Sequence, residues 1–256
     1  MPEPLNPAAA VGFDQGAASY EQGRPSYPAD TVAWLVDGLG IRPGRRVLDL
    51  AAGTGKFTRL LVPTGADLLA VEPVAGMREQ FAAVLPDVEI VSGTADELPV
   101  ADDSFDVITV AQAFHWFDLP LACAEIHRVL RPGGGLGLVW NERDTSVPWV
   151  AELSRIIRWD ERGDWQVPYT VEVDWAVRFA EGTTLFSPME VHHSSHAQVI
   201  DADTLVARVL STSYIAAAAR PEQDRIAARV RDLVEGFPDR FDLPYVTVAY
   251  RSNAVG

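Results

Sequence analysis

Cysteine is almost absent from this chain of 256 residues, which contains only Cys123. A single cysteine excludes a disulfide within the chain and is typical of a protein from a reducing compartment. Cys123 lies in a stretch with helical spacing, where we expect a small buried apolar residue. No apolar run approaches the roughly 20 residues that cross a membrane, and the start, Met-Pro-Glu-Pro, is not typical of a signal peptide. We therefore expect a cytoplasmic protein with no membrane partner.

Basic residues are also scarce. The chain has 21 Lys and Arg against 36 Asp and Glu, which gives a formal net charge of −15. Binding to nucleic acid through its phosphates requires a basic surface, so we expect no nucleic-acid partner. The 18 prolines and 19 glycines are spread along the chain, without a repeat or a low-complexity segment. The length is sufficient for a single domain with a large core.

The most informative segment runs from Val47 to Thr58. Val47–Leu50 is a short apolar run, as expected of a buried parallel strand. A turn of small residues follows, Ala-Ala-Gly-Thr-Gly at 51–55, and then a pattern with helical spacing begins. A strand, a glycine turn and a helix form the first half of a nucleotide-binding βαβ unit. Glycine in such a turn allows a ligand to lie against the backbone.

An acidic residue ends the next predicted strand, as Glu72 follows the apolar run 67–71. Glu72 comes 23 positions after Asp49, a spacing that places its carboxylate to bind the hydroxyls of a ribose. Thr58 occupies the third glycine position of the dinucleotide fingerprint, and Lys56 is not followed by the Ser or Thr of a P-loop. A nucleoside without a pyrophosphate therefore fits better than NAD or ATP, which indicates S-adenosylmethionine.

With these motifs, the chain resembles the class I S-adenosylmethionine-dependent methyltransferases, in particular the type 11 group that includes trans-aconitate methyltransferase-like enzymes. The resemblance covers nearly the whole chain. Besides the turn and Glu72, it rests on the segments 18–28, 93–99, 104–108 and 128–134. Ala51 stands where the first glycine of the group usually lies, and Thr94 where an aspartate often contacts the adenine amino group. Alanine is nearly as small as glycine, and threonine still accepts a hydrogen bond.

The resemblance implies a Rossmann-like α/β fold. We expect a seven-stranded, mostly parallel sheet with an antiparallel last strand, and a helical lid over the carboxyl ends of the strands. The pattern itself alternates predicted strands with helices, which favours a parallel sheet covered on both faces. These strands are expected at 46–50, 68–71, 88–91, 105–110 and 135–140, followed by others at 189–199 and 245–250. Helices are expected at 31–39, 119–130, 150–159, 173–180, 205–219 and 221–237.

We interpret the chain as a single methyltransferase domain over 1–256. Its parts are a mobile N-terminal segment at 1–30, a cofactor-binding core at 31–140, acceptor-binding or lid additions at 141–240 and a final strand at 244–251. In the family the N-terminal segment folds over the cofactor, so its Tyr20 and Arg24 are suited to the methionyl carboxylate.

The resemblance also implies the residues that form the site. S-Adenosylmethionine, or its product S-adenosylhomocysteine, is expected to contact Tyr20, Arg24, Asp49, Ala51, Gly53, Gly55, Glu72, Pro73, Met77, Thr94, Ala95, Gln112 and Phe114. The acceptor is expected to contact Trp116, Trp140, Asn141 and Tyr214.

His115 is the candidate catalytic residue. It follows the fourth predicted strand, where the acceptor should approach, and it titrates near neutral pH. Methyl transfer from a sulfonium requires mainly alignment and exclusion of water, and a base only when the acceptor must lose a proton. His115 is therefore a candidate general base or acceptor-binding residue, with stabilisation of the loop as the alternative.

No metal is expected. His192 and His196 share one face of a predicted strand while His193 points to the other, and no cysteine or carboxylate partner is close in sequence.

The leading interpretation is an enzyme that methylates a small-molecule acceptor by in-line displacement, as a monomer or weak homodimer. The alternatives are a protein or RNA methyltransferase, or a non-catalytic subunit that binds S-adenosylmethionine. The charge disfavours RNA, as does the absence of an Asn/Asp-Pro-Pro-Tyr/Phe motif at 112–115. An intact glycine turn and Glu72 disfavour the non-catalytic subunit.

Overall fold

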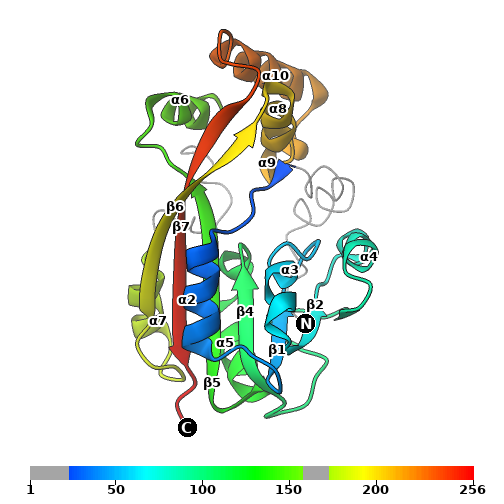
Figure 1. Ribbon diagram of the computed structural model, residues 1–256, viewed down its shortest axis with the longest axis vertical. Helices are drawn as coiled ribbons and strands as arrows, with labels where there is room; N and C mark the ends of the chain where they lie inside the picture. Colours follow the sequence, from blue (N-terminus) through cyan, green and yellow to red (C-terminus); the bar gives the residue numbers. More distant parts are fainter. Residues whose placement is uncertain (1–22, 158–172) are drawn as a thin grey trace. The chain divides into compact units, whose positions relative to one another are not determined.

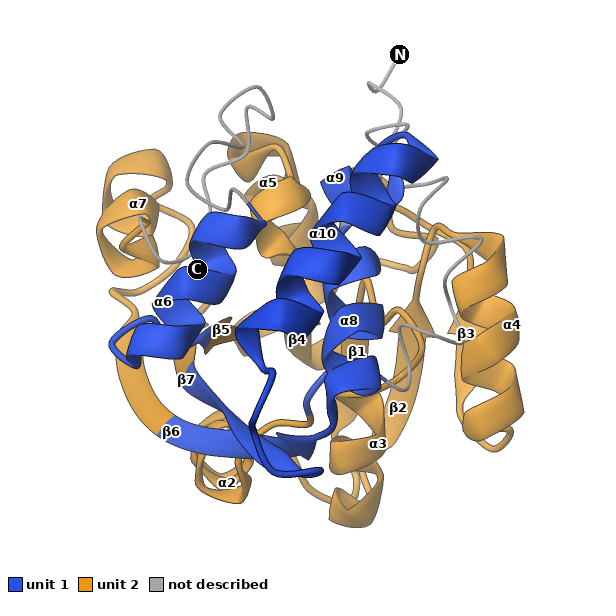
Figure 2. Ribbon diagram, turned by 90° about the horizontal axis from the view of Figure 1, so that it is seen from above, with its two compact units in different colours: residues 1–25, 143–166, 195–246 blue, residues 26–142, 167–194, 247–256 orange. Residues whose placement is uncertain are grey.

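The computed structural model describes residues 23–157 and 173–256. Tyr20, Trp159 and most of the predicted N-terminal segment lie outside the described residues. The chain divides into two compact units, which Figure 2 colours separately. The sheet unit comprises 26–142, 167–194 and 247–256, and the helical unit comprises 1–25, 143–166 and 195–246. The single domain with its four parts and its lid stays a prediction.

Seven strands form one sheet in the order β3-β2-β1-β4-β5-β7-β6 (Figure 1). Their bounds are β1 Arg46–Leu50, β2 Asp67–Val71, β3 Glu89–Val91, β4 Phe105–Ala111, β5 Leu130–Arg143, β6 Glu190–Ile200 and β7 Phe241–Asn253. The first five strands are parallel to one another, and β7 runs antiparallel to β5 and β6. The predicted mostly parallel sheet with an antiparallel last strand is therefore confirmed.

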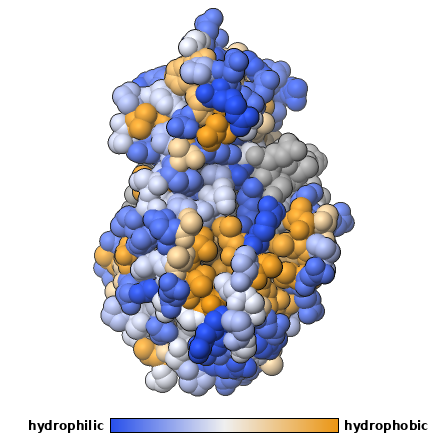
Figure 3. Space-filling view, viewed as in Figure 1, coloured by the Kyte–Doolittle hydropathy of each residue, from blue (hydrophilic) through white to orange (hydrophobic). Residues whose placement is uncertain are grey.

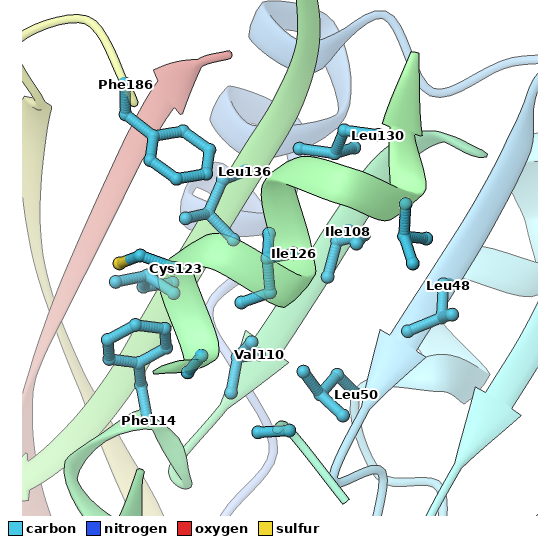
Figure 4. Packing of buried hydrophobic residues seen from close by; sticks show 14 of the residues in the cluster. Leu48, Leu50, Ile108, Val110, Phe114, Cys123, Ile126, Leu130, Leu136 and Phe186 are labelled. Carbon is cyan, nitrogen blue, oxygen red and sulfur yellow. The ribbon is translucent and has the colours of Figure 1, made fainter. Parts of the chain in front are cut away.

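The two central strands, β1 and β4, are apolar on both faces because both faces are covered. Leu48 of β1 pairs with Ile108 of β4, and Leu50 with Val110. All four side chains are almost fully buried. Figure 4 shows them together with Cys123 and Ile126 of the neighbouring helix α5. Burial raises the pKa of the Cys123 thiol to about 12, as expected of a small apolar core residue.

Helices of the sheet unit cover both faces of its strands. They are α2 Ala29–Leu39, α3 Thr58–Leu61, α4 Ala75–Val84, α5 Leu119–Val129 and α7 Trp175–Gly182, with 3₁₀ turns at Val62–Thr64 and Phe114–Trp116. The predicted end of α2 is confirmed, since Gly40 takes the left-handed conformation at φ 66°. Figure 3 shows apolar side chains gathered around α2 and α3 on one face of this unit.

The helical unit has a core of its own. It contains α6 Pro148–Ile156, α8 Ala202–Leu210, α9 Ser213–Ala216 and α10 Arg220–Leu233, of which α10 packs on α6 and α8. The predicted single helix at 205–219 is wrong, because the chain breaks between α8 and α9. At that break the Ser211 hydroxyl donates to the carbonyl oxygen of Arg208 at 2.8 Å, which satisfies a backbone group at the end of α8.

The fifth strand is longer than predicted. Phe105 of β4 pairs with Leu130 of β5, but Val107 pairs with Gly135, so five steps along β5 match two along β4. The Arg-Pro-Gly-Gly segment at 131–134 was expected to separate a helix from a strand, but it is an irregularity within β5. Pro132 has no N–H to donate to β4, and Gly133 takes φ 73°. The backbone of β5 therefore departs from β4 after Leu130 and pairs with it again from Gly135. No described helix is long and apolar enough to span a membrane.

Candidate active site

The carboxyl ends of the central strands bring the predicted motifs to one edge of the sheet. Leu50 pairs with Val71 of β2 and with Val110 of β4, so the residues that follow these strands lie at the same edge. The strand order also reverses beside β1. Open α/β sheets bind their ligands at such a point.

The turn after β1 contains three residues in the left-handed region: Ala51 at φ 55°, Gly53 at 57° and Gly55 at 83°. A Cβ on Gly55 would lie 2.7 Å from Leu85 and 2.8 Å from Phe81, so only glycine fits there. A Cβ on Gly53 would meet no described atom within 4 Å. The backbone of Gly53 therefore borders open space, where a ligand can lie against it.

Ala51 is strained in this turn, which explains why the family usually has glycine at this position. An L-residue in the left-handed conformation loses about 1–2 kcal/mol relative to its usual conformations. Backbone strain of this kind is concentrated at functional sites.

The strain predicts opposite effects for two neighbouring substitutions. Ala51→Gly should stabilise the protein by up to about 1 kcal/mol, because relief of strain exceeds the added entropy of the unfolded chain. Ala52→Gly relieves no strain, since Ala52 is not among the residues with positive φ, and should destabilise by about 0.5–1 kcal/mol. Urea unfolding of both variants measures the difference. Equal destabilisation by the two would contradict strain at Ala51.

Glu72 connects the end of β2 to the glycine turn. Its Oε2 accepts the N–H of Gly53 at 3.0 Å, and its Oε1 accepts the N–H of Val74 at 2.9 Å. Glu72 is only 5% exposed, and burial raises the pKa of its carboxyl. Each carboxylate oxygen retains a further lone pair. Glu72 can therefore accept hydrogen bonds from two adjacent hydroxyls, as predicted for a ribose.

Arg78 supports this arrangement and was missed in the sequence. Its Nη1 donates to the carbonyl oxygens of Glu72 at 2.8 Å and Pro73 at 2.7 Å. The guanidinium thereby holds the segment between β2 and α4 that carries Glu72. A basic residue six positions after the acidic strand end was the only sequence signal for it.

Asp49 is buried near the carboxyl end of β1, where it is 1% exposed. Thr58 donates its hydroxyl to Oδ2 at 2.5 Å, and Thr109 of β4 donates to Oδ1 at 2.8 Å. Burial raises the pKa of Asp49 to about 6, against the lowering effect of these hydroxyls. The carboxyl of Asp49 therefore connects β1 to β4 and to the first residue of α3. Its predicted contact with the cofactor stays a prediction.

The other predicted cofactor residues lie around the same edge. Gln112 follows β4 with φ 61°, and its Nε2 donates to the carbonyl oxygen of Asn141 at 3.2 Å. Thr94 forms an isolated antiparallel bridge with Glu97. Met77 and Ala95 are buried. Phe114 is buried as well, and its ring packs edge-on against Phe117 and Trp175 and also contacts Phe179. Phe114 is thus part of the core, and its predicted contact with the cofactor stays a prediction.

His115 and Trp116 lie on the 3₁₀ turn after β4, and both are partly buried. Their rings are in contact, with centroids 4.9 Å apart. Nδ1 of His115 lies 3.2 Å from Nε1 of Trp140, which donates its hydrogen. This edge therefore presents an imidazole whose orientation is set by a tryptophan.

Trp140 and Asn141, which were predicted to contact the acceptor, are both buried. Trp140 is 1% exposed, and its ring stacks on Trp175, with centroids 5.3 Å apart and planes at 6°. The amide of Asn141 accepts from Thr247 at 2.6 Å and donates to the carbonyl oxygen of Ser26 at 3.0 Å. Both side chains make structural contacts, and Trp140 donates to His115 at the edge. Their predicted contact with the acceptor stays a prediction.

Two predicted site residues belong to the helical unit. Arg24 is partly buried there. The hydroxyl of Tyr214 donates to the carbonyl oxygen of Ile157 at 2.9 Å, within the same unit. The roles of Arg24 with the cofactor and of Tyr214 with the acceptor stay predictions.

The histidines of β6 have separate partners. His192 stacks on Trp34 with centroids 5.2 Å apart, and His196 stacks on Tyr245 at 5.4 Å. His193 is exposed on the opposite face, as the strand pattern predicted. Within 23–157 and 173–256, no group of three or more His, Cys, Asp or Glu is arranged to hold a metal ion.

Comparison with known proteins agrees with this geometry. The sequence profile of a family described as "Methyltransferase domain" matches residues 48–138. A protein of Mycobacterium tuberculosis named as an uncharacterized methyltransferase is 39% identical over 249 residues, which cover 95% of this chain and 96% of that protein. The chain belongs to the class I S-adenosylmethionine-dependent methyltransferases, in their type 11 group.

Two further similarities cover less of the relatives' own length. A demethylmenaquinone methyltransferase of Renibacterium salmoninarum is 36% identical over 135 residues, 48% of this chain and 57% of that protein. The structure of a Haemonchus contortus phosphoethanolamine N-methyltransferase with S-adenosylhomocysteine covers 95% of this chain and 58% of its own, with a TM-score of 0.57 and 15% identity. The second similarity shows a shared fold.

S-Adenosylmethionine fits the residues of this methyltransferase. The open space beside Gly53 can receive a nucleoside, and the Glu72 carboxylate has lone pairs for the two ribose hydroxyls. The third glycine of a dinucleotide site is replaced by Thr58, whose hydroxyl is bonded to Asp49.

Proposed function

We propose that this methyltransferase acts on a small-molecule acceptor by in-line displacement, in the cytoplasm and as a monomer or weak homodimer. The observation that carries the proposal is the set of side chains at the edge of the sheet where β4 ends. Gln112, His115 and Trp116 supply an amide, an imidazole and an aromatic ring there. Such groups orient a small organic molecule by hydrogen bonds and stacking.

Two further observations support a small acceptor. The net charge of −15 opposes an RNA substrate, whose phosphates require basic partners. The Renibacterium salmoninarum relative is named for a small acceptor, demethylmenaquinone.

The residues of the chain have separate tasks in this reaction. When bound, S-adenosylmethionine supplies a methyl group already activated on a sulfonium. Glu72 and the turn around Gly53 bind its nucleoside part, and Arg78 holds Glu72 in place. His115 and Gln112 orient the acceptor at the end of β4. The protein thereby lowers the barrier mainly by alignment.

A labelling experiment tests the class of acceptor. The enzyme is incubated with S-adenosylmethionine carrying a labelled methyl group and a bacterial extract, which is then separated into small molecules, protein and RNA. We expect enzyme-dependent label in the small-molecule fraction, and less label with Glu72→Ala when the cofactor concentration is close to the wild-type Kd. Label in protein or RNA would overturn the proposal. Cofactor binding without label in any fraction would support the non-catalytic subunit instead.

A further inference from the structure

The bond between Trp140 and His115 determines which imidazole nitrogen carries the proton. The indole nitrogen of tryptophan is a donor only. Its N–H points to Nδ1 of His115 at 3.2 Å, so Nδ1 must offer its lone pair. In the neutral ring the proton is then on Nε2. His115 is thus held as the Nε2–H tautomer.

The donor in this bond is held rigidly. Trp140 stacks on Trp175 and meets the edge of Tyr250 at 5.9 Å, while its ring is almost fully buried. His115 lies on a short 3₁₀ turn and is partly buried. The strand β5 therefore sets the position of the Trp140 indole, and the indole sets the orientation of the His115 imidazole.

The geometry also argues against His115 as a general base. A general base must accept a proton on a nitrogen with an available lone pair. The lone pair of Nδ1 is directed at the indole hydrogen, and Nε2 already carries its proton. Removal of a proton from the acceptor would require the bond to Trp140 to break.

We propose that Trp140 is a positioning residue that holds His115 as an Nε2–H hydrogen-bond donor to the methyl acceptor. This inference rests on the proposed function and restricts its substrate class. The acceptor presents a lone pair to His115 and reaches the site with its nucleophilic atom already free of the proton. A different lone pair, on the nucleophilic atom of the acceptor, forms the bond to the methyl carbon while the carbon–sulfur bond breaks and leaves its electrons on sulfur. No proton passes to His115.

Nuclear magnetic resonance tests the bond without any acceptor. In protein labelled with ¹⁵N on tryptophan and histidine, we expect scalar coupling between Nε1 of Trp140 and Nδ1 of His115, and the ¹⁵N shifts of the Nε2–H tautomer. His115→Gln assigns the signals by their loss. Trp140→Phe keeps an aromatic ring on Trp175 but removes the donor, so a signal from the Nδ1–H tautomer should appear.

Trp175→Phe is the matched control. Trp175 belongs to the same stack, but its buried Nε1 makes no hydrogen bond to any described residue. This variant should leave the tautomer of His115 unchanged. Absence of the coupling in the wild type, or an equal effect of the two variants, would overturn the assignment to Trp140.

Two substitutions of His115 separate a donor from a base. The amide nitrogen of glutamine lies near the position of Nε2, and the amide of asparagine lies near that of Nδ1. For a donor, His115→Asn should raise the KM of the acceptor roughly tenfold, and His115→Gln, whose amide N–H lies near Nε2, should raise this KM less than His115→Asn does. Trp140→Phe should also raise this KM, with cofactor affinity unchanged.

A base would give a different result, because both His115 variants would lose about 10²-fold or more in kcat. That loss would overturn the donor role. If no small molecule is methylated at all, the proposed function fails, while the resonance experiment still decides on the bond between Trp140 and His115.

Discussion

Replacing Glu72 with alanine is expected to weaken S-adenosylmethionine binding by about 1–3 kcal/mol, or roughly 5- to 150-fold in Kd. The carboxylate is held by the N–H groups of Gly53 and Val74, with its remaining lone pairs available to ribose hydroxyls. Alanine leaves those hydroxyls without an acceptor and also releases the turn. Isothermal titration calorimetry measures the affinity.

Glu72→Gln tests whether both acceptor oxygens of Glu72 are needed. Glutamine keeps the shape but replaces one acceptor oxygen with a donor group, which then faces the N–H of Gly53 or Val74. We therefore expect weaker binding from this variant as well. Glu79→Gln on the same segment is the control, because Glu79 is exposed on α4 and should bind normally. Unchanged affinity in both Glu72 variants would remove Glu72 from the cofactor site.

The second large effect concerns the stability of the protein and pH. The pKa of Asp49 is raised from 3.8 to about 6 in the folded protein, because the carboxyl is buried. The folded state therefore binds the proton more tightly than the unfolded state does. The free energy of unfolding that this group contributes is present below about pH 4 and is lost as pH rises through 6. The full difference is about 3 kcal/mol.

Asp49→Asn removes this titration. Its side-chain oxygen can accept one threonine hydroxyl and its amide can donate to the other, so the site keeps its hydrogen bonds. The stability of the variant relative to the wild type should increase by about 2 kcal/mol between pH 4 and 7, most of the full difference. Urea unfolding at several pH values measures the two curves.

Asp67→Asn is the control for Asp49. Asp67 begins β2 with an exposed side chain that pairs with Arg46 at the surface, where such pairs contribute little. The pH dependence of this variant should follow the wild type. If the curves of Asp49→Asn and the wild type are parallel from pH 4 to 7, the raised pKa is refuted.

The main fold could be predicted because its signals are local. The apolar runs of β1 and β4 indicate strands covered on both faces, and Gly40 indicates the end of α2. The irregularity in β5 could not be predicted, because Arg-Pro-Gly-Gly at 131–134 has the same composition whether it separates a helix from a strand or interrupts a strand. Its pairing with β4 decides between them.

The sequence by itself determined the family, the sheet and the place of the cofactor turn with Glu72, because these follow from short-range spacing. Only the tertiary structure decided the environment of the polar side chains. Thr109 reaches Asp49 from 60 positions away, and Trp140 reaches His115 from 25 positions away. The pKa of a carboxyl and the tautomer of an imidazole depend on burial and on partners from distant segments, which appear only when those segments pack together.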